Sequence, residues 1–264
     1  MTRNLTLLAA GLLLFSHPMM TWMLNDGYSR IIELALYFLF CQTLHQLMLH
    51  GDVRSIINTA VCFALMLIGD ARLIYVAAIA VPFLALVAPP DMIKTSRISF
   101  FLIILFPAIA MVLSYLYINH IVATIPFGVM QMIGSSVPTI LPDFKPITWQ
   151  YTYGGELPWP PAQFLVTAVA SFPLAILAPV WLRRERLLAV PIFISALVPL
   201  IASIVTLYAP FTDYPATMLM LLWVPTALAS YAFIMRGRGM TVIVMLILGW
   251  LGSTLVLSVP GVLS

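Results

Sequence analysis

Carboxylates in short turn sequences are the residues of this chain best suited to chemistry. Asp26 stands in an Asn-Asp-Gly-Tyr sequence, Asp70 in a Gly-Asp-Ala-Arg sequence that ends in Arg72, and Asp213 in a Phe-Thr-Asp-Tyr sequence. Carboxylates at the mouth of a membrane cavity act as general bases, hold a divalent cation beside a phosphate, or bind a proton. The competing interpretation is structural, because Asn-Asp-Gly is a turn signature, Asp before Tyr-Pro caps a helix, and Asp70 can pair with Arg72.

A further carboxylate, Glu33, follows Arg30 by three residues, which places both side chains on one face of a helix. An ionisable group just inside the hydrocarbon is costly unless it is paired or wetted. Pairing with Arg30 meets this requirement, and the alternative is that Glu33 lines a cavity. The histidines lack metal-ligand spacing and are expected to make polar contacts between helices. They are His17, His45, His50 and His120.

The composition of the chain indicates an integral membrane protein. Hydrophobic residues form 62% of the chain, charged residues form 8%, and the mean hydropathy is +1.08. Soluble domains are about 45–50% apolar and about 25% charged. At about 20 apolar residues per span, the chain has room for roughly nine helices and no sizeable soluble domain. We therefore expect an all-α polytopic bundle, with residues 1–264 forming a single membrane domain.

Apolar runs bounded by charges or turn sequences define the expected transmembrane helices. They are 5–24, 31–49, 55–69, 73–88, 98–118, 163–182, 188–208, 216–235 and 241–262. Because cytoplasmic loops collect Lys and Arg, we expect the N-terminus inside and the C-terminus outside. This topology leaves only Arg30, Arg72 and Lys145 of the 12 basic residues outside. Merging 55–69 with 73–88 would reverse the later loops, so we predict two separate spans. The net charge of +3 is then an orientation signal and indicates no nucleic-acid partner.

The ends of the chain and its one long loop complete this organisation. Arg3 and the apolar residues after it resemble the start of a secretory signal, but no small-residue cleavage site follows, so we expect an uncleaved first span. The loop 119–162 is rich in proline, tryptophan and tyrosine. Proline disfavours a regular helix, and Trp and Tyr favour the headgroup layer. The sequence therefore predicts an interfacial lid over the outer face.

Prolines inside the expected spans suggest a different kind of site. Helices that proline interrupts form the substrate sites of many transporters, although prolines are also ordinary in membrane helices. The prolines in question are Pro82, Pro107, Pro173, Pro191, Pro199 and Pro225.

The order of segments in the first half of the chain also points to a family. A span containing Ser16-His17-Pro18 is followed by Asn25-Asp26-Gly27-Tyr28-Ser29, and residues 63–72 read as a short helix ending in a polar turn. Tyr117-Ile118-Asn119-His120 then precedes the outer loop. Over about residues 15–130, this order resembles the membrane half of GT-C type glycosyltransferases, which use polyprenyl-phosphate-linked sugars.

The resemblance implies a site at the outer face of the membrane. Asp26 would be a general base or metal ligand, and Asp70 with Arg72 would hold a phosphate or a divalent cation. The expected substrate-binding residues are Arg72, Glu33, Asn119 and His120. The family carries its catalytic acid in a large first outer loop, whereas this chain has about six residues there. That departure predicts a shortened relative or an unrelated protein with similar hydrophobic hairpins. Its role would be that of a reduced enzyme or of a non-catalytic partner.

The sequence thus favours a role in cell-envelope glycan or lipid-linked sugar metabolism, in a bacterial inner membrane. Its expected partners are the lipid bilayer, a polyprenyl-phosphate-linked sugar and other membrane subunits. Two alternatives stay open. One is a structural or assembly subunit of a larger membrane complex, in which helix packing is the function. The other is a small-solute transporter that uses Glu33 and proline-broken helices.

Overall fold

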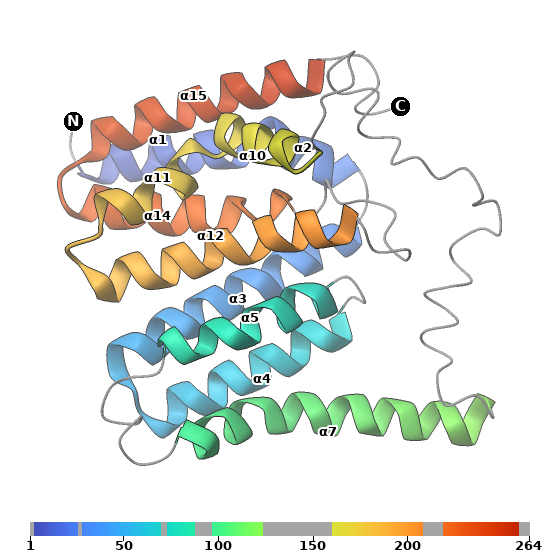
Figure 1. The fold of residues 1–264 in the computed structure, drawn as a ribbon. Coiled ribbons are helices and arrows are strands. Elements are labelled where there is room, and N and C mark those ends of the chain that lie inside the picture. Colours follow the sequence, from blue (N-terminus) through green and yellow to red (C-terminus); the bar gives the residue numbers. More distant parts are fainter. Residues whose placement is uncertain are drawn as a thin grey trace.

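The computed structural model describes residues 3–25, 28–69, 73–87, 97–123, 160–207 and 219–258. Within these ranges the protein is all-helical and contains no strand (Figure 1). In chain order the helices are α1 (Arg3–Phe15), α2 (Pro18–Asn25), α3 (Tyr28–His50), α4 (Val53–Gly69), α5 (Leu73–Val87), α7 (Arg97–Ala123), α10 (Pro160–Ser171), α11 (Pro173–Trp181), α12 (Arg186–Leu207), α14 (Trp223–Met235) and α15 (Gly239–Ser258). The expectation of an all-α fold is therefore confirmed for the described residues.

Each apolar run expected from the sequence coincides with one helix or with two consecutive helices. The run 5–24 forms α1 and α2, and the run 163–182 forms most of α10 and α11. The short runs 55–69 and 73–88 form separate helices, α4 and α5, which pack against each other.

Length and hydropathy make this a membrane protein. Among the described residues, three helical stretches are long and apolar enough to cross a bilayer, and further apolar helices are shorter. The three stretches are Ile31–His50, Ile98–Ile118 and Arg186–Val205. Of these, the stretch in α7 is the least covered by protein, with 12% of its residues buried, so most of its surface is available to lipid.

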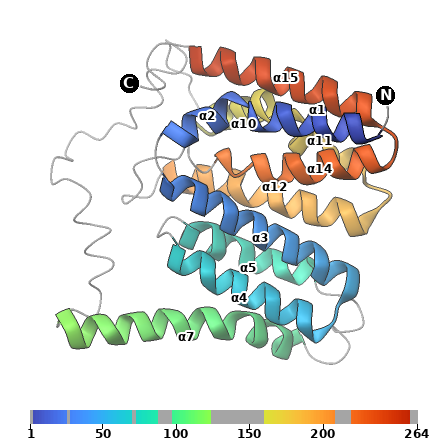
Figure 2. The ribbon, with the colours of Figure 1, turned by 180° about the vertical axis from the view of Figure 1, so that it is seen from behind.

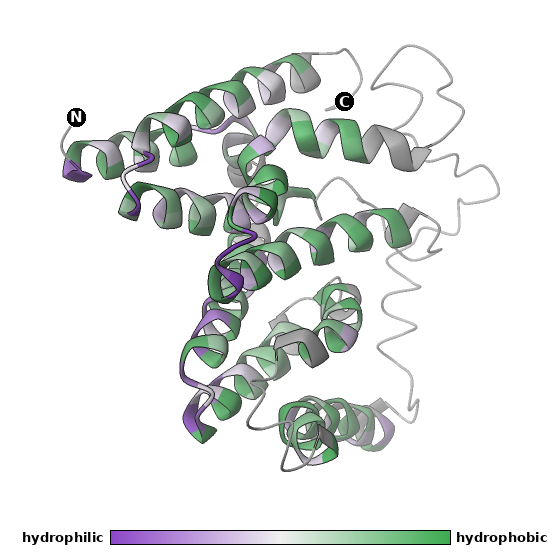
Figure 3. Ribbon diagram, turned by 60° about the vertical axis from the view of Figure 1, so that its left-hand side comes forward, coloured by the Kyte–Doolittle hydropathy of each residue, from purple (hydrophilic) through white to green (hydrophobic). Residues whose placement is uncertain are grey.

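The helices lie side by side and alternate in direction, so the molecule has two distinct ends (Figures 1 and 2). The N-terminus lies at the same end as the turns after α3, α11 and α14. Hydrophilic residues gather there (Figure 3). The arginines with described side chains belong to this end, which we call the basic end. They are Arg3, Arg54, Arg183, Arg184, Arg186, Arg236 and Arg238.

The turns at the basic end are closed by glycine. Gly51 follows α3 with a φ of 61°, and Gly237 follows α14 with a φ of 76°. Only glycine adopts this left-handed conformation without steric cost, and it commonly ends helices. The backbone N–H of Gly51 donates to the carbonyl of Leu47 at 2.9 Å, which caps the last turn of α3.

The core is built around α3 and α12, which pack against each other. Tyr37 and Phe40 of α3 are fully buried, and Phe40 stacks at an angle on Phe63 of α4 with ring centroids 5.9 Å apart. The Tyr37 hydroxyl donates to the backbone carbonyl of Ser195 in α12 at 2.7 Å. That carbonyl needs an outside donor, because Pro199 has no N–H to offer four residues later in the helix.

On the opposite side of the bundle, α15 approaches α10 closely through glycine. A Cβ atom added at Gly252 would lie 2.2 Å from the backbone oxygen of Ala170, and one at Gly249 would lie 2.6 Å from that of Ser171. Because backbone cannot give way as a flexible side chain can, these positions admit no larger residue without separating the helices.

Gly252→Ala is expected to lower the thermal midpoint of unfolding in detergent, with a cost of about 1–3 kcal/mol for overpacking. Gly11→Ala is the matched control, because Gly11 is also helical but an added Cβ would meet no atom within 4 Å. The control is expected to stabilise the protein by roughly 0.5–1 kcal/mol through helix propensity. Equal midpoints for the two variants would contradict the close approach of α15 to α10.

Candidate functional site

The residues expected at the outer site are only partly described. Asp26, Asp70, Arg72 and Asp213 lie outside the described residues, as does 124–159, most of the expected lid. The helices that flank them are described: α2 and α3 on either side of Asp26, and α4 and α5 on either side of Asp70 and Arg72.

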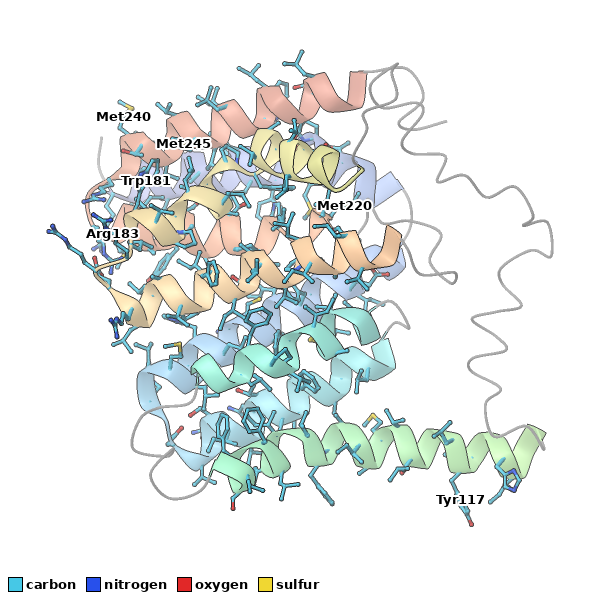
Figure 4. The ribbon with its side chains drawn as sticks, in the orientation of Figure 1. Tyr117, Trp181, Arg183, Met220, Met240 and Met245 are labelled. Atoms are coloured by element: carbon cyan, nitrogen blue, oxygen red, sulfur yellow. The ribbon has the colours of Figure 1, made fainter. Side chains whose placement is uncertain are left out.

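The remaining candidates lie in different surroundings. Glu33 is buried in α3, with 4% of its surface exposed. Asn119 and His120 belong to the last turns of α7, where His120 is exposed. Tyr117 in the same turns is 66% exposed and points away from the bundle (Figure 4). Since α4 packs between α3 and α7, the structure does not bring Glu33 and His120 together.

A different constellation forms where the first expected span is interrupted. Pro18 has no N–H to donate to the carbonyl of Leu14, so α1 ends at Phe15 and α2 begins at Pro18. The backbone N–H of His17 donates to the Leu14 carbonyl at 3.4 Å, and indole N–H groups from other helices bond to carbonyls of the same break. Nε1 of Trp223 donates to the oxygen of Leu14 at 3.0 Å, and Nε1 of Trp250 donates to that of Ser16 at 2.9 Å.

The second interruption lies directly against the first. Pro173 is the first residue of α11, and Phe172 between α10 and α11 has a non-helical backbone (φ −132°, ψ 53°). Nε2 of His17 lies 3.1 Å from the carbonyl oxygen of Ser171 and 3.2 Å from Oγ of Ser253 in α15. The imidazole also stacks on the Phe172 ring, with centroids 4.9 Å apart and planes 18° apart. His17 thus joins both helix breaks to α15.

Two polar atoms in this joint are buried and have no hydrogen-bond partner among the described residues, namely Nδ1 of His17 and Oγ of Ser171. Contact with a carbonyl oxygen requires the proton on Nε2 of His17, which leaves Nδ1 as a free acceptor. His17 is 3% exposed and Ser171 is 2% exposed, so bulk water does not satisfy them. The joint can therefore accept a proton or hold a small polar group between interrupted helices.

Metal binding receives no support from the described residues, which contain no cluster of three His, Cys, Asp or Glu side chains. Cys41 and Cys62 are free thiols in α3 and α4.

The sequence assigned His17 to contacts between helices, and the structure agrees. It did not pair His17 with Ser171. A signal was present, because both breaks carry a Ser-x-Pro sequence, Ser16-His17-Pro18 and Ser171-Phe172-Pro173. Among the prolines that the sequence offered as possible helix interruptions, Pro173 stands at one. Others lie inside continuous helices: Pro82, Pro107, Pro191 and Pro199.

At the basic end, an ion pair joins two turns that are far apart in sequence. Nε of Arg236 donates to Oε1 of Glu185 at 2.8 Å, and its Nη2 contacts Oε2. Hydrogen bonds from Arg236 hold the pKa of Glu185 below its usual value. The pair ties the turn between α11 and α12 to the turn between α14 and α15.

Asp52 at the same end caps α4. Its Oδ1 accepts the backbone N–H of Ser55 at 2.9 Å and also contacts the Ser55 hydroxyl. These donors lower the pKa of Asp52. The arrangement is that of an N-cap, which satisfies one of the free N–H groups of the first helical turn.

Comparisons with protein-family models, curated proteins and solved structures found no match to this chain.

His17→Leu is expected to lower the thermal midpoint in detergent, because it leaves the Ser171 carbonyl without a donor in a buried site, a cost of about 1–3 kcal/mol. His17→Gln keeps an N–H group and is expected to recover part of the loss. His120→Leu, at an exposed histidine, serves as the control and should leave the midpoint unchanged. A His17→Leu midpoint equal to that of the control would show that the imidazole does not bridge the breaks.

Proposed function

We propose that this protein spans a bacterial inner membrane nine times, with its N-terminus inside and its C-terminus outside. The support is the separation of charge along the bundle. The arginines with described side chains gather at one end, together with the N-terminus (Figure 3). Cytoplasmic loops are the ones enriched in Arg and Lys, so the basic end would face the cytoplasm.

The function supported best is a role in cell-envelope glycan or lipid-linked sugar metabolism at the outer face, as a reduced GT-C-like glycosyltransferase or its non-catalytic partner. One observation carries this proposal. The ends of α2 and α4, after which Asp26 and Asp70 follow in sequence, lie opposite the basic end. Because α3 packs against α2, α4 and α5, the helix ends that flank Asp26 and Asp70 belong to one group of helices.

The proposed chemistry follows from the lipid-linked substrate. A polyprenyl-phosphate sugar keeps its chain in the bilayer and its phosphate at the surface. A carboxylate there would accept the proton of an acceptor hydroxyl or hold a divalent cation, and Arg72 would bind the phosphate. In the non-catalytic version the same surface would face another membrane subunit.

Asp26→Asn and Asp70→Asn are expected to lower sugar transfer from a polyprenyl-phosphate donor at least about 100-fold, as loss of a general base or metal ligand does. Both variants should still accumulate in the membrane. Asp52→Asn is the matched control, because Asp52 lies at the basic end and asparagine also caps helices. Transfer is measured in proteoliposomes, and native mass spectrometry records the lipid retained by each variant.

Tolerance of both substitutions, without a retained polyprenyl lipid, would overturn the enzymatic proposal. Stoichiometric retention of another membrane protein in the same spectra would then favour an assembly subunit.

A small-solute transporter is the second candidate, and the paired helix breaks favour it. Transporter sites are commonly built where two interrupted helices meet inside the bilayer. Here α1/α2 and α10/α11 run in opposite directions and meet at His17 and Ser171. The free Nδ1 of His17 and the buried Glu33 would bind the coupling proton or the solute.

For a transporter, Glu33→Gln is expected to abolish solute uptake and leave envelope glycan composition unchanged. Uptake of radiolabelled amino acids and sugars into cells expressing the protein measures this, with His120→Gln as an exposed control. Uptake that persists in the Glu33→Gln variant would argue against a role of Glu33 in transport.

A further inference from the structure

A pocket of about 680 Å³ lies at the basic end of the bundle, between two elements that are far apart in sequence. Its walls come from His45 and Leu49 of α3, from Arg184 and Glu185 in the turn after α11, and from the first residues of α12. It is remote from the helix breaks and from the proposed outer site, and neither candidate function uses it.

Positive charge dominates the surroundings of this pocket. The two adjacent turns carry Arg183, Arg184, Arg186, Arg236 and Arg238. Among the described carboxylates, Glu33 is buried in α3 and Asp52 caps α4, which leaves Glu185 for this cluster. Both oxygens of Glu185 are engaged by Arg236. The guanidinium groups that line the pocket therefore lack a protein carboxylate of their own in the described part of the chain.

The helix that begins here adds to the same field. Arg186 is the first residue of α12, a helix of 22 residues. The N-terminus of a helix carries a partial positive charge and favours anions. The residue before Arg186 is Glu185, whose carboxylate is already paired with Arg236. An anion from outside would therefore be stabilised by the guanidinium groups of Arg184 and Arg186 and by the helix dipole together.

The pocket is also partly apolar. Leu49 and Leu187 line it and are 48% and 52% exposed. His45 lies one helical turn before Leu49 in α3, toward the centre of the membrane-spanning stretch. The pocket thus combines arginines with exposed leucines at the ends of two membrane-spanning stretches.

We propose that this pocket binds the headgroup of an anionic phospholipid. Arg184 and Arg186 hold the phosphate through forked hydrogen bonds, and the acyl chains lie against Leu49 and Leu187. Arginine suits this role because its planar group binds phosphate oxygens in pairs. Basic pockets between membrane helices on the cytoplasmic side are sites of this kind. A soluble anion would leave the apolar wall uncovered, so the lipid fits the whole pocket better.

General attraction between a basic surface and an anionic membrane is the competing explanation, and Arg183 separates the two. It belongs to the same turn, is exposed, and lies at the basic end of the bundle (Figure 4), but it does not line the pocket. Removing its charge changes the surface field as much as removing the charge of Arg184 does. A specific site in the pocket predicts that lipid binding is weakened by loss of the Arg184 charge and not by loss of the Arg183 charge.

The experiment is a lipid titration of the purified full-length protein in detergent, followed by native mass spectrometry. Phosphatidylglycerol and phosphatidylcholine are the anionic and zwitterionic probes. We expect the protein to retain phosphatidylglycerol preferentially, Arg184→Gln and Arg186→Gln each to lose at least about tenfold in apparent affinity, and Arg183→Gln to stay within about twofold. These ranges reflect the loss of charge-assisted phosphate contacts. Thermal midpoints measured without lipid establish that each variant is folded.

Equal affinity losses in Arg184→Gln and in Arg183→Gln would overturn the site in favour of general surface charge. Displacement of the lipid by millimolar inorganic phosphate would overturn it in favour of a soluble anion. Should a glutamine variant fail to accumulate, Arg184→Lys and Arg186→Lys each keep the charge and remove only the forked geometry. Their affinities must then fall more than that of Arg183→Lys, and an equal fall would also reject the proposal.

Discussion

The need of every backbone carbonyl for a donor inside the hydrocarbon is the constraint on which this structure depends. Lipid offers no hydrogen bonds, so each proline within a helix creates a carbonyl that another group must satisfy. In this chain, side-chain donors from distant helices bond to such carbonyls. Pro18 frees the carbonyl of Leu14, which Trp223 caps, and Pro199 frees that of Ser195, which Tyr37 caps. These bonds act across helices, so they fix how the helices pack.

The same constraint explains why the first and last parts of the chain form one unit. His17 satisfies the Ser171 carbonyl, and Trp250 of α15 satisfies the Ser16 carbonyl. Donors of this kind reach their acceptors only if the backbones lie close together, which the glycines of α15 permit. Each bond is worth roughly 0.5–1.5 kcal/mol net, but an unsatisfied carbonyl costs more. The breaks and their donors therefore form a mutually dependent set.

Much of the helical fold could be predicted from the sequence, because apolar runs and charged turns report directly on helices in a bilayer. The separation of α4 from α5 followed from the distribution of basic residues. The position of the helix breaks and the residues that bond to them could not be predicted. A run such as 163–182 reads as one apolar stretch whether or not the helix breaks at Phe172. A proline sequence marks a possible break, but Pro191 and Pro199 remain inside a continuous α12.

Hydrogen bonds from other helices are described both at prolines that break a helix and at one that does not. At Pro199, the Tyr37 hydroxyl donates to the carbonyl of Ser195, and α12 continues without a break. At Pro18, the indole N–H groups of Trp223 and Trp250 donate to the carbonyls of Leu14 and Ser16. His17, which lies in the same break, contacts the carbonyl of Ser171 in the second break. Interhelical hydrogen bonds of this kind satisfy carbonyls that a proline or a helix break leaves without a backbone donor. The local Ser-x-Pro sequence therefore marks the break at Pro18, but the contact of His17 with the second break depends on how distant helices pack.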